Sequence, residues 1–568
     1  MAQTLKKTDV VIIGLGAGGG VAALPLAQAG LKVIGIEAGG WLNFTDFPPD
    51  QLVASRWPQI VKKTQQEVPT VRANASVQNG PPTGTHPMMN AVGGTSVHYW
   101  AQHWRLNPWD FQVVSRTTAR YGASAIPAGS TVTDWPFGYD ELESYYDKVE
   151  YEVGVSGKAG NLNGKLDPAG NIFEGPRKRE FPMPPLRGTG FTDLLDKTAR
   201  GLGWHPFRSP AAITSQTYEG RPGCEYHGIC SGAGCPIGAK SSTTWTTIPK
   251  AQATGNFKVE ARARVMEILV DSNGKATGVR YVKQRHEYIQ PADAVLLASY
   301  NYENNRLLLL SKSTPFPNGL GNNSGQVGQH YFSHNTSGTV NVQFPFDLNL
   351  WYGLPAQGTS LDDWADDNFD HTGLGFIGGG LIHVYTSRSP QSTPTINAPS
   401  PNWGSNWKAY VNQYADRSPN LYLQKTTLPY EGNFIDLDPV YTDTLGVPVP
   451  RITGTWRQNE QMIGTFIQQK VAQLMTAAGA NYVQIAAPVS TTNPMGSSTH
   501  AYGGTRMGTD PATSVVDQYA FSHECPNLGI IGGSVFVTSG CHNPTETIQA
   551  LAWRTAEHLA QNWKTITA

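Results

Sequence analysis

The stretch that decides the fold is Asp9–Gly20, which reads Asp-Val-Val-Ile-Ile-Gly-Leu-Gly-Ala-Gly-Gly-Gly. Its apolar, strand-forming half enters a glycine-rich turn. Residues 21–29 then carry a helical pattern, residues 31–36 form a second apolar run, and Glu37 stands at the end of that run. The order strand, glycine turn, helix, strand and acidic residue is typical of a dinucleotide-binding α/β unit.

The spacing Gly14-x-Gly16-x-x-Gly19 explains how such a unit would bind its ligand. Glycines let the backbone approach a pyrophosphate, which sits on the positive N-terminus of the helix. Glu37 follows about twenty residues on, where a carboxylate accepts a hydrogen bond from a ribose hydroxyl. The stretch therefore predicts dinucleotide binding. The alternative is a glycine-rich turn in another kind of α/β protein.

Bulk properties exclude several other classes. The chain has 568 residues, and its net charge of −1 with scattered basic residues argues against a nucleic-acid partner. No apolar run reaches the roughly eighteen residues of a transmembrane helix, so we expect no direct membrane span. The N-terminus enters the first strand almost directly, and we expect no signal peptide in this chain. The five cysteines do not resemble a disulfide framework.

Periodicity predicts further elements along the chain. Residues 139–153 and 458–478 have the pattern of amphipathic helices, with Asp140 as the N-cap of the first. A last helix is expected from Pro544 to about Gln561, with Asn543 as its N-cap. Short alternating segments between about 330 and 490 favour an antiparallel sheet and hence a second domain.

Four motifs together resemble one enzyme family. They are the glycine turn with Glu37, the Gly93–Gly94 pair, the segment His500–Gly508 (His-Ala-Tyr-Gly-Gly-Thr-Arg-Met-Gly), and Asn543-Pro544-Thr545. In this combination, over nearly the whole length, the chain resembles the glucose-methanol-choline (GMC) oxidoreductases. Within that family it is most similar to the flavoprotein (large) subunits of gluconate 2-dehydrogenases, on residues 368–371, 403–408 and 432–441. It is more distantly similar to bacterial glucose and fructose dehydrogenase large subunits.

The resemblance implies the chemistry of the site. Family members move a hydride from a carbinol carbon to N5 of FAD while a base takes the hydroxyl proton. His500 matches the catalytic histidine, and an imidazole suits this role because its pKa of about 6.5 is close to working pH. Asn543 matches the residue that anchors the substrate hydroxyl, and Pro544 and Thr545 follow it toward the flavin. Without the family, a lone histidine such as His500 is more often a structural residue and Asn543 more often only a helix cap. His542 is expected to point elsewhere.

Two further cofactor features follow from the resemblance. In several relatives a histidine at the position of His98 is bonded covalently to the flavin, and here such a bond and simple packing both stay open. In gluconate dehydrogenase relatives a cysteine-rich segment holds a [3Fe-4S] cluster, and Cys224, Cys230 and Cys235 match it in part. His227 stands where a further cysteine is common. Retention of the segment without a cluster and a zinc site with His227 are the alternatives.

The expected fold is α/β, with a Rossmann-like FAD-binding domain and an antiparallel-sheet α+β substrate domain. Several side chains of the second domain could face a polyol, but their spacing assigns none: His334, Asp370, His371 and His383. The FAD-binding domain is expected from residues 1–105, 206–330 and 495–568, and the substrate domain, with its lid, from residues 106–205 and 331–494.

The expected reaction is oxidation of a secondary alcohol of a sugar or sugar acid, D-gluconate to 2-dehydro-D-gluconate foremost. The resemblance implies a small export subunit and a cytochrome c subunit as partners. It therefore implies a periplasmic or membrane-associated location, and a cytoplasmic one stays open. The alternatives are a sugar or glycoside oxidase or dehydrogenase that uses oxygen or quinone directly, and a non-catalytic subunit that only relays electrons.

Overall fold

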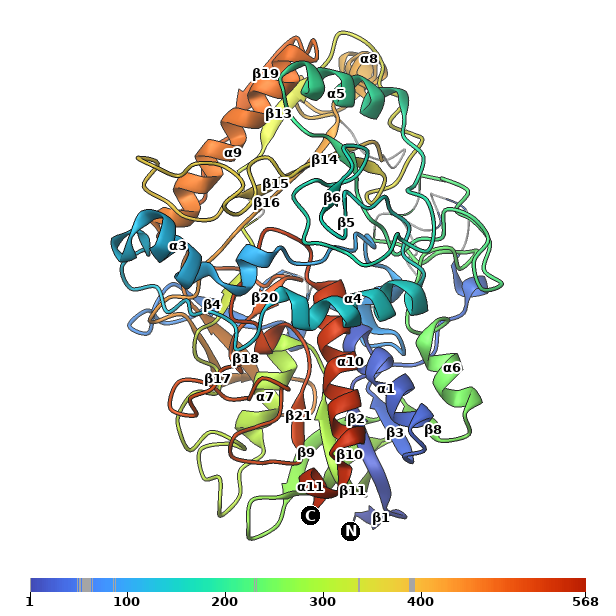
Figure 1. Ribbon diagram of the computed structural model, residues 1–568, viewed down its shortest axis with the longest axis vertical. Coiled ribbons are helices and arrows are strands. Elements are labelled where there is room, and N and C mark those ends of the chain that lie inside the picture. The colour runs from blue at the N-terminus through green and yellow to red at the C-terminus, as the bar shows by residue number, and fades with distance from the viewer. Residues whose placement is uncertain are drawn as a thin grey trace.

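The computed structural model describes residues 2–47, 50, 53, 63, 65–84, 86, 88–228, 230, 232–335, 338–387 and 394–568. The elements form two halves (Figure 1). The lower half in that view contains the largest sheet and both chain termini. The upper half contains a second, antiparallel sheet with long helices beside it. This arrangement confirms the expected α/β fold with an antiparallel second part.

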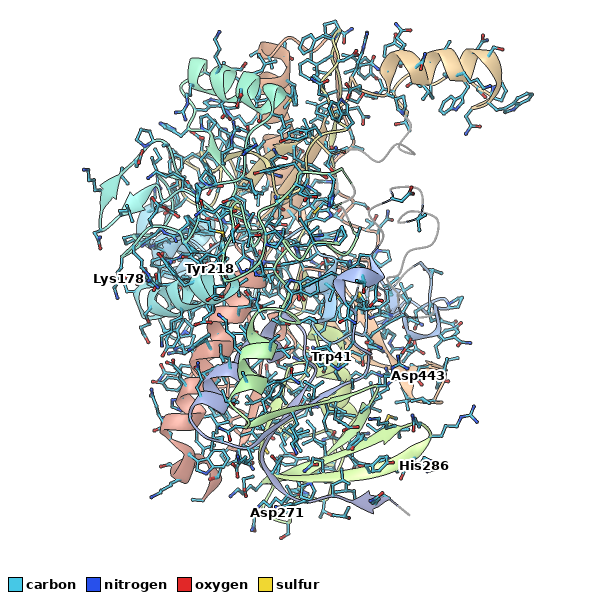
Figure 2. All side chains as sticks on the ribbon, turned by 90° about the vertical axis from the view of Figure 1, so that its right-hand side faces the viewer. Trp41, Lys178, Tyr218, Asp271, His286 and Asp443 are labelled. Atoms are coloured by element: carbon cyan, nitrogen blue, oxygen red, sulfur yellow. The ribbon has the colours of Figure 1, made fainter. Side chains whose placement is uncertain are left out.

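The large sheet has the strand order β8-β3-β2-β11-β10-β9. Neighbours from β8 to β11 are parallel, and β1 and β21 also pair with β11 in parallel. Strands β9, β10 and β11 form an antiparallel meander that reaches the edge of the molecule at His286 (Figure 2). The strands are β1 (Gln3–Thr4), β2 (Thr8–Ile13), β3 (Val33–Glu37), β8 (Phe257–Ala261), β9 (Arg264–Val270), β10 (Ala276–Lys283), β11 (His286–Leu297) and β21 (Leu528–Ile530).

The central strands are apolar because helices and loops cover both faces of the sheet. Val10, Val11 and Ile12 of β2 are fully buried. Helix α1 packs against both α6 and α10, and α10 in turn packs against α4. The helices of this half are α1 (Ala17–Gln28), α4 (Tyr139–Val153), α6 (Thr247–Ala253), α7 (Asn301–Leu310), α10 (Thr545–Gln561) and α11 (Trp563–Thr567).

The upper half is built on the antiparallel sheet β16-β15-β14-β7. Helix α9 packs on β15 and β16, and α5 packs on α9 and β14, around a core that includes Phe191, Phe344 and Ile467. Helix α8 projects from this half in the second view (Figure 2). The elements are α5 (Gly190–Gly201), α8 (Gly404–Tyr414), α9 (Gln458–Ala477), β7 (Phe207–Arg208), β13 (Val340–Gln343), β14 (Gly358–Leu361), β15 (Gly380–Tyr385), β16 (Asn420–Lys425) and β19 (Tyr482–Ile485).

Smaller strand pairs complete the fold. Strand β18 pairs with β17 and with β4, and β12 pairs with β20. Their bounds, with the remaining ones, are α3 (Val113–Tyr121), β4 (Thr70–Arg72), β5 (Asn161–Leu162), β6 (Lys165–Leu166), β12 (Phe332–Ser333), β17 (Phe434–Thr442), β18 (Pro448–Thr453) and β20 (Ala501–Tyr502). In the described residues, no helix combines the length and the apolar character that crossing a bilayer requires.

The sequence located the helices well but misplaced some of their starts. Helix α1 begins at Ala17 rather than at residue 21, because Gly18, Gly19 and Gly20 already form its first turn. Gly138 is the N-cap of α4, and Asp140 lies inside the first turn, where its charge still favours the helix dipole. The strands of the large sheet come from residues 3–37, 257–297 and 528–530, but the expected domain boundaries stay a prediction.

Candidate active site

In the glycine turn after β2, the backbone packs too closely against neighbouring backbone to leave room for side chains. Gly14 has φ +86°, and a Cβ there would lie 2.7 Å from the carbonyl oxygen of Ala298. A Cβ on Gly19 would lie 2.0 Å from the carbonyl oxygen of Gly14. Gly16 is the N-cap of α1 and offers no side chain to bond its first N–H groups. The N-terminus of α1 is therefore available to an anion.

A second glycine loop meets the first. Gly94 has φ +53°, and a Cβ on it would lie 2.8 Å from Cα of Gly16. A Cβ on Gly93 would lie 2.0 Å from Oγ1 of Thr244. Any side chain at Gly94 would push apart the two backbones that form the cradle. The two glycine motifs of the sequence thus form one structure, although about eighty residues separate them.

Glu37 lies at the carboxyl end of β3. Its Oε2 accepts from the N–H of Leu15 at 2.9 Å, and its Oε1 accepts from the N–H of Gly39 at 2.8 Å. Burial raises the pKa of this carboxyl group, and the two backbone donors oppose that rise. Each oxygen keeps a second lone pair, so Glu37 can hold the glycine turn and still accept from a ribose hydroxyl.

One cavity of about 610 Å³ connects these parts, a size usual for cofactor sites. It follows the carboxyl ends of the parallel strands, where open α/β sheets bind ligands. The predicted site residues in its wall are Gly14, Gly16, Glu37, Gly94, His98, His500, Asn543, Pro544 and Thr545. Gly19 and Gly93 lie behind the wall, where they permit the close packing.

His500 and Asn543 face each other in this cavity. The amide Nδ2 of Asn543 lies 3.4 Å from Nε2 of His500. The Oδ1 of Asn543 is buried and has no hydrogen-bond donor among the described residues. A hydroxyl group placed between the two side chains would complete both sets of hydrogen bonds. The structure thus brings together the two residues that the sequence paired as base and anchor.

A third residue, His334, holds His500 from behind. Its Nδ1 lies 3.0 Å from Nδ1 of His500, and its Nε2 lies 2.9 Å from the carbonyl oxygen of Gly540. A carbonyl only accepts, so His334 carries its proton on Nε2 and accepts at Nδ1. His500 must then donate from Nδ1, which leaves a lone pair on its Nε2 toward Asn543. The hydroxyl of Tyr502 lies 3.1 Å from the same Nδ1 of His334.

Burial keeps these imidazoles neutral. Desolvation lowers the pKa of His500 to about 4 and, together with the neighbouring His500, lowers the pKa of His334 well below its usual value. At neutral pH His500 is therefore unprotonated and able to take a proton. The sequence places His334 only among several candidates for a polyol pocket, and packing shows its contact with His500.

Asn543 is not the N-cap of the last helix. Pro544 occupies that position, and α10 begins at Thr545 without a side-chain cap. The amide of Asn543 instead faces His500, so capping and site formation are separate here. His542 points away from the cavity, as expected, and its Nε2 lies 3.0 Å from Oδ2 of Asp362. The uncapped N–H groups of α10 add a positive helix end at the cavity.

Three aromatic rings and an amide, which sequence reasoning missed, extend the site. Trp100 packs edge-on against Tyr385 and Tyr422, with centroid distances of 5.5 and 5.3 Å. Trp100, Tyr422 and Gln102 line the cavity. Both polar atoms of the Gln102 amide are buried without a partner in the described structure. Trp100 and Gln102 directly follow the Gly93–His98 segment, which is the signal that could have found them.

Other sequence candidates lie elsewhere. His371 donates from Nε2 to the carbonyl oxygen of Gly378, and His383 donates from Nε2 to that of Pro355 while its Nδ1 contacts the hydroxyls of Ser209 and Ser360. Asp370 accepts from the N–H of Thr372 in a local turn. None of these three side chains lines the cavity.

The cysteine loop lies beside the cavity. Cys224 and Cys230 are partly exposed and Cys235 is buried, all as free thiols. The buried Lys240 donates to the carbonyls of Cys230 and Ala233 at 2.9 and 2.8 Å and holds the loop. Gly232 of this loop is part of the cavity wall. In the described residues the three sulfurs do not gather within 4.8 Å, as a single zinc ion would require.

Comparisons with known proteins agree with this geometry. Two GMC oxidoreductase models match residues 208–336 and 429–552. The chain is 31% identical to the gluconate 2-dehydrogenase flavoprotein of Pantoea cypripedii, over 99% of this chain and 95% of that protein. It is 31% identical to 2-methyl-1,2-propanediol dehydrogenase of Mycolicibacterium austroafricanum, over 100% of this chain and 97% of that protein. It is 28% identical to the fructose dehydrogenase large subunit of Gluconobacter japonicus, over 99% of this chain and 100% of that protein.

Solved structures give the same fold. Pyridoxine 4-oxidase from Mesorbium loti superposes with a TM-score of 0.64 at 14% identity, over 97% of this chain and 99% of that one. Formate oxidase of Aspergillus oryzae superposes with a TM-score of 0.61. The site and these comparisons define a flavin-dependent oxidoreductase of CH–OH donors. The chain belongs to the GMC oxidoreductases.

Proposed function

We propose that this protein oxidises a secondary alcohol of a sugar or sugar acid, and that its substrate is D-gluconate, which becomes 2-dehydro-D-gluconate. The observation that carries the proposal is the pairing of His500 with Asn543 across the cavity, at 3.4 Å. The similarity to the gluconate 2-dehydrogenase flavoprotein over the full chain supports the choice of gluconate.

The residues of the cavity fit FAD. Two uncapped helix N-termini, a glycine cradle and the Glu37 carboxylate meet the requirements of pyrophosphate and ribose. FAD, when bound, supplies the hydride acceptor. Asn543 would donate from its amide to the substrate hydroxyl oxygen, and His500 would take the hydroxyl proton at Nε2. His334 would keep that nitrogen free by accepting from Nδ1 of His500.

The neighbouring groups suit a polyol. Trp100 and Tyr422 present apolar ring faces of the kind that stack on sugar carbons, and the Gln102 amide offers a donor and an acceptor. A small aliphatic diol would leave the amide unsatisfied, which costs about 1–3 kcal/mol for a buried polar group. The site therefore favours a substrate with several hydroxyls.

The direct test is anaerobic mixing of purified protein with D-gluconate while the flavin absorbance is recorded. We expect the flavin bands to bleach, and D-fructose and 2-methyl-1,2-propanediol to act more weakly. Unchanged bands with gluconate but bleaching with another polyol would overturn the substrate and keep the reaction class. A flavin that no polyol reduces, but that a partner reduces, would favour the electron-relay alternative.

The pH dependence follows from the lowered pKa of His500. The base form is the neutral one, so activity is present above the pKa and lost as pH falls through it. We expect kcat/KM to stay level from neutral pH to near pH 5 and to fall about tenfold per unit below the pKa of about 4. Initial rates in constant-ionic-strength buffers measure this, with circular dichroism to show that the fold persists. An acidic limb near 6.5, the ordinary histidine value, would contradict the assignment.

We further propose that Cys224, Cys230 and Cys235 hold a [3Fe-4S] cluster that takes electrons from the flavin. Each thiolate of such a cluster binds a different iron, so the sulfurs need not converge on one point. Lys240 supports this reading because a buried cation beside the loop offsets thiolate charge. Burial raises the pKa of Cys224 to about 12, so cluster assembly would release protons.

Iron analysis tests the cluster. Protein purified anaerobically should contain about three iron ions per chain, and Cys235→Ser should lose them while it keeps its flavin. Cys525→Ser, which removes a buried thiol outside the loop, is the matched control and should keep its iron. A flavin-loaded wild-type protein without iron would refute the cluster and favour direct transfer to oxygen or quinone, which oxygen-consumption assays distinguish.

We also propose that the flavin is bonded covalently to His98. His98 lies in the cavity wall, where a bond to the flavin could form. Acid precipitation decides this point, since a covalently bonded flavin stays in the pellet and a non-covalently bound one enters the supernatant.

We propose a small export subunit and a cytochrome c subunit as partners, with a periplasmic or membrane-associated complex. Co-purification and cell fractionation test both statements.

A further inference from the structure

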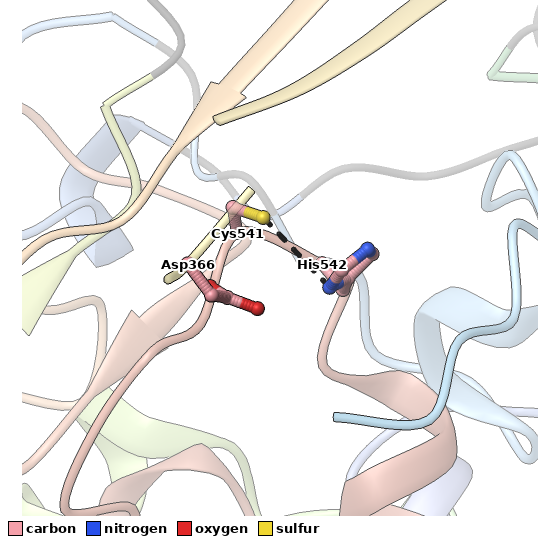
Figure 3. A group of neighbouring side chains, drawn as sticks. All are labelled: Asp366, Cys541 and His542. Carbon is pink, nitrogen blue, oxygen red and sulfur yellow. Dashed lines mark hydrogen bonds between the residues drawn. The ribbon is translucent and has the colours of Figure 1, made fainter. Parts of the chain in front are cut away.

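A compact group of side chains that could bind a metal lies next to Asn543, because two of its three members directly precede Asn543 in the chain. Asp366, Cys541 and His542 each offer one ligand atom, and these atoms lie within 4.8 Å of one another (Figure 3). The sulfur of Cys541 is 3.8 Å from Nδ1 of His542. Asp366 and Cys541 are fully buried, and His542 is 1% exposed. Neighbouring ligands of a tetrahedral zinc ion are separated by about 3.5 Å, given metal–ligand bonds of about 2.0–2.3 Å.

The surroundings of His542 match those of a metal-bound imidazole. Its Nε2 lies 3.0 Å from Oδ2 of Asp362, a carboxylate that also accepts from Nδ2 of Asn171 at 2.6 Å. Nε2 therefore carries a proton, and in the neutral imidazole that binds a metal the lone pair is on Nδ1, which faces the Cys541 sulfur. Histidine ligands of metals commonly donate their second N–H to a carboxylate in this way.

Among the described residues, two buried carboxyl oxygens at or near this group have no hydrogen-bond donor. The Oδ2 of Asp366 accepts from Nδ2 of Asn107 at 2.7 Å, but Oδ1 of Asp366 is buried without a donor in the described part of the chain. The same holds for Oδ1 of Asp110, whose Oδ2 accepts from the N–H of Asn107. Buried acceptors normally find a donor or an ion.

The candidate site is also rich in buried carboxyl groups. Asp110, Asp362 and Asp366 are all fully buried. In the described structure their ion pairs comprise only the His542–Asp362 contact, which is charged only when His542 is protonated. Burial and the neighbouring carboxylates raise the pKa of Asp110 and of Asp366, so both groups hold protons more readily than usual, and a bound divalent ion would displace those protons.

We infer that Asp366, Cys541 and His542 bind a structural Zn²⁺ ion, with Asp362 as the carboxylate that orients His542. A thiolate, an imidazole and a carboxylate form the mixed donor set that zinc accepts, whereas Mg²⁺ and Ca²⁺ prefer oxygen alone. Three protein ligands leave a fourth position for water or for the nearby Asp110 carboxylate.

Such an ion would fix the site from behind. The ligands Cys541 and His542 directly precede Asn543, and Asp366 belongs to the segment that follows β14 of the other half. The ion would therefore tie the loop that carries the hydroxyl anchor to the substrate half. The inference does not depend on the substrate, and it is separate from the Cys224–Cys235 loop.

Metal analysis provides the test. Protein produced with zinc in the medium and dialysed against a weak chelator should retain about one zinc ion per chain by plasma mass spectrometry. The isosteric variant Asp366→Asn and the variant Cys541→Ser should each lose at least about nine-tenths of it. Cys525→Ser should retain it, and so should the triple serine variant of Cys224, Cys230 and Cys235, which excludes the other cysteine loop as the zinc site.

Coordination is checked on the wild-type protein, so that a variant that fails to fold does not decide the question. Cobalt substituted for zinc should show a thiolate-to-metal charge-transfer band, and zinc X-ray absorption should show one sulfur neighbour. Wild-type protein without zinc after growth in excess zinc would overturn the inference. So would zinc that survives Cys541→Ser, or a bound Mg²⁺ or Ca²⁺ ion with oxygen ligands alone.

Discussion

Replacing His500 by glutamine should lower kcat/KM for the alcohol by about 10²–10⁴-fold, the usual contribution of a positioned general base. Glutamine keeps polar atoms near the position of the ring but accepts no proton at neutral pH. Burial keeps His500 neutral, and the contact with His334 leaves the lone pair on Nε2 of His500. The substitution removes this nitrogen and therefore the proton acceptor. Stopped-flow measurement of flavin reduction under anaerobic conditions isolates this step.

Flavin content and a matched variant make that result interpretable. The flavin-to-protein ratio of His500→Gln should equal that of the wild type, because the glycine cradle is untouched. His205→Gln replaces a histidine whose side chain is 45% exposed and pairs with Asp363, and its kcat/KM should be unchanged. Flavin reduction at the wild-type rate in His500→Gln would remove the base assignment.

The Gly94→Ala substitution should raise the Kd for FAD by at least about tenfold, which corresponds to about 1.4 kcal/mol. The new Cβ would stand 2.8 Å from Cα of Gly16, which is a backbone atom that no rotamer change can move away. The two loops must separate, and the cradle for the pyrophosphate opens. Equilibrium titration of apoprotein with FAD, followed by fluorescence, measures the loss.

Gly30→Ala is the control for backbone strain alone. Gly30 has φ +88°, and a Cβ there would meet no atom within 4 Å. Its alanine variant should lose some stability but bind FAD as the wild type does. If Gly94→Ala also binds FAD normally, the close approach of the two glycine loops is not required for the cofactor, and the cradle must be relocated.

Local signals predicted the parts of this fold that neighbouring residues control. The apolar run of β2, the glycine turn and Glu37 at the end of β3 form a continuous unit, and its conformation depends on chain neighbours a few residues away. Helices α4, α9 and α10 were predicted for the same reason. The predicted N-caps Asp140 and Asn543 were wrong, because Gly138 caps α4 and Pro544 caps α10. A residue caps a helix only if its side chain bonds the free backbone N–H groups of the first turn, and the Asn543 side chain contacts His500 instead.

The sequence alone was enough to predict the dinucleotide-binding unit and, through family resemblance, to nominate His500 and Asn543 as the catalytic pair. Their contacts with each other and with other side chains depend on tertiary packing. His334, which lies 166 residues from His500, sets the His500 tautomer because Gly540 O fixes its own proton. The grouping of Asp366 with Cys541 and His542 likewise depends on packing of the two halves. Such contacts join side chains far apart in the chain, and no local periodicity encodes which of them meet.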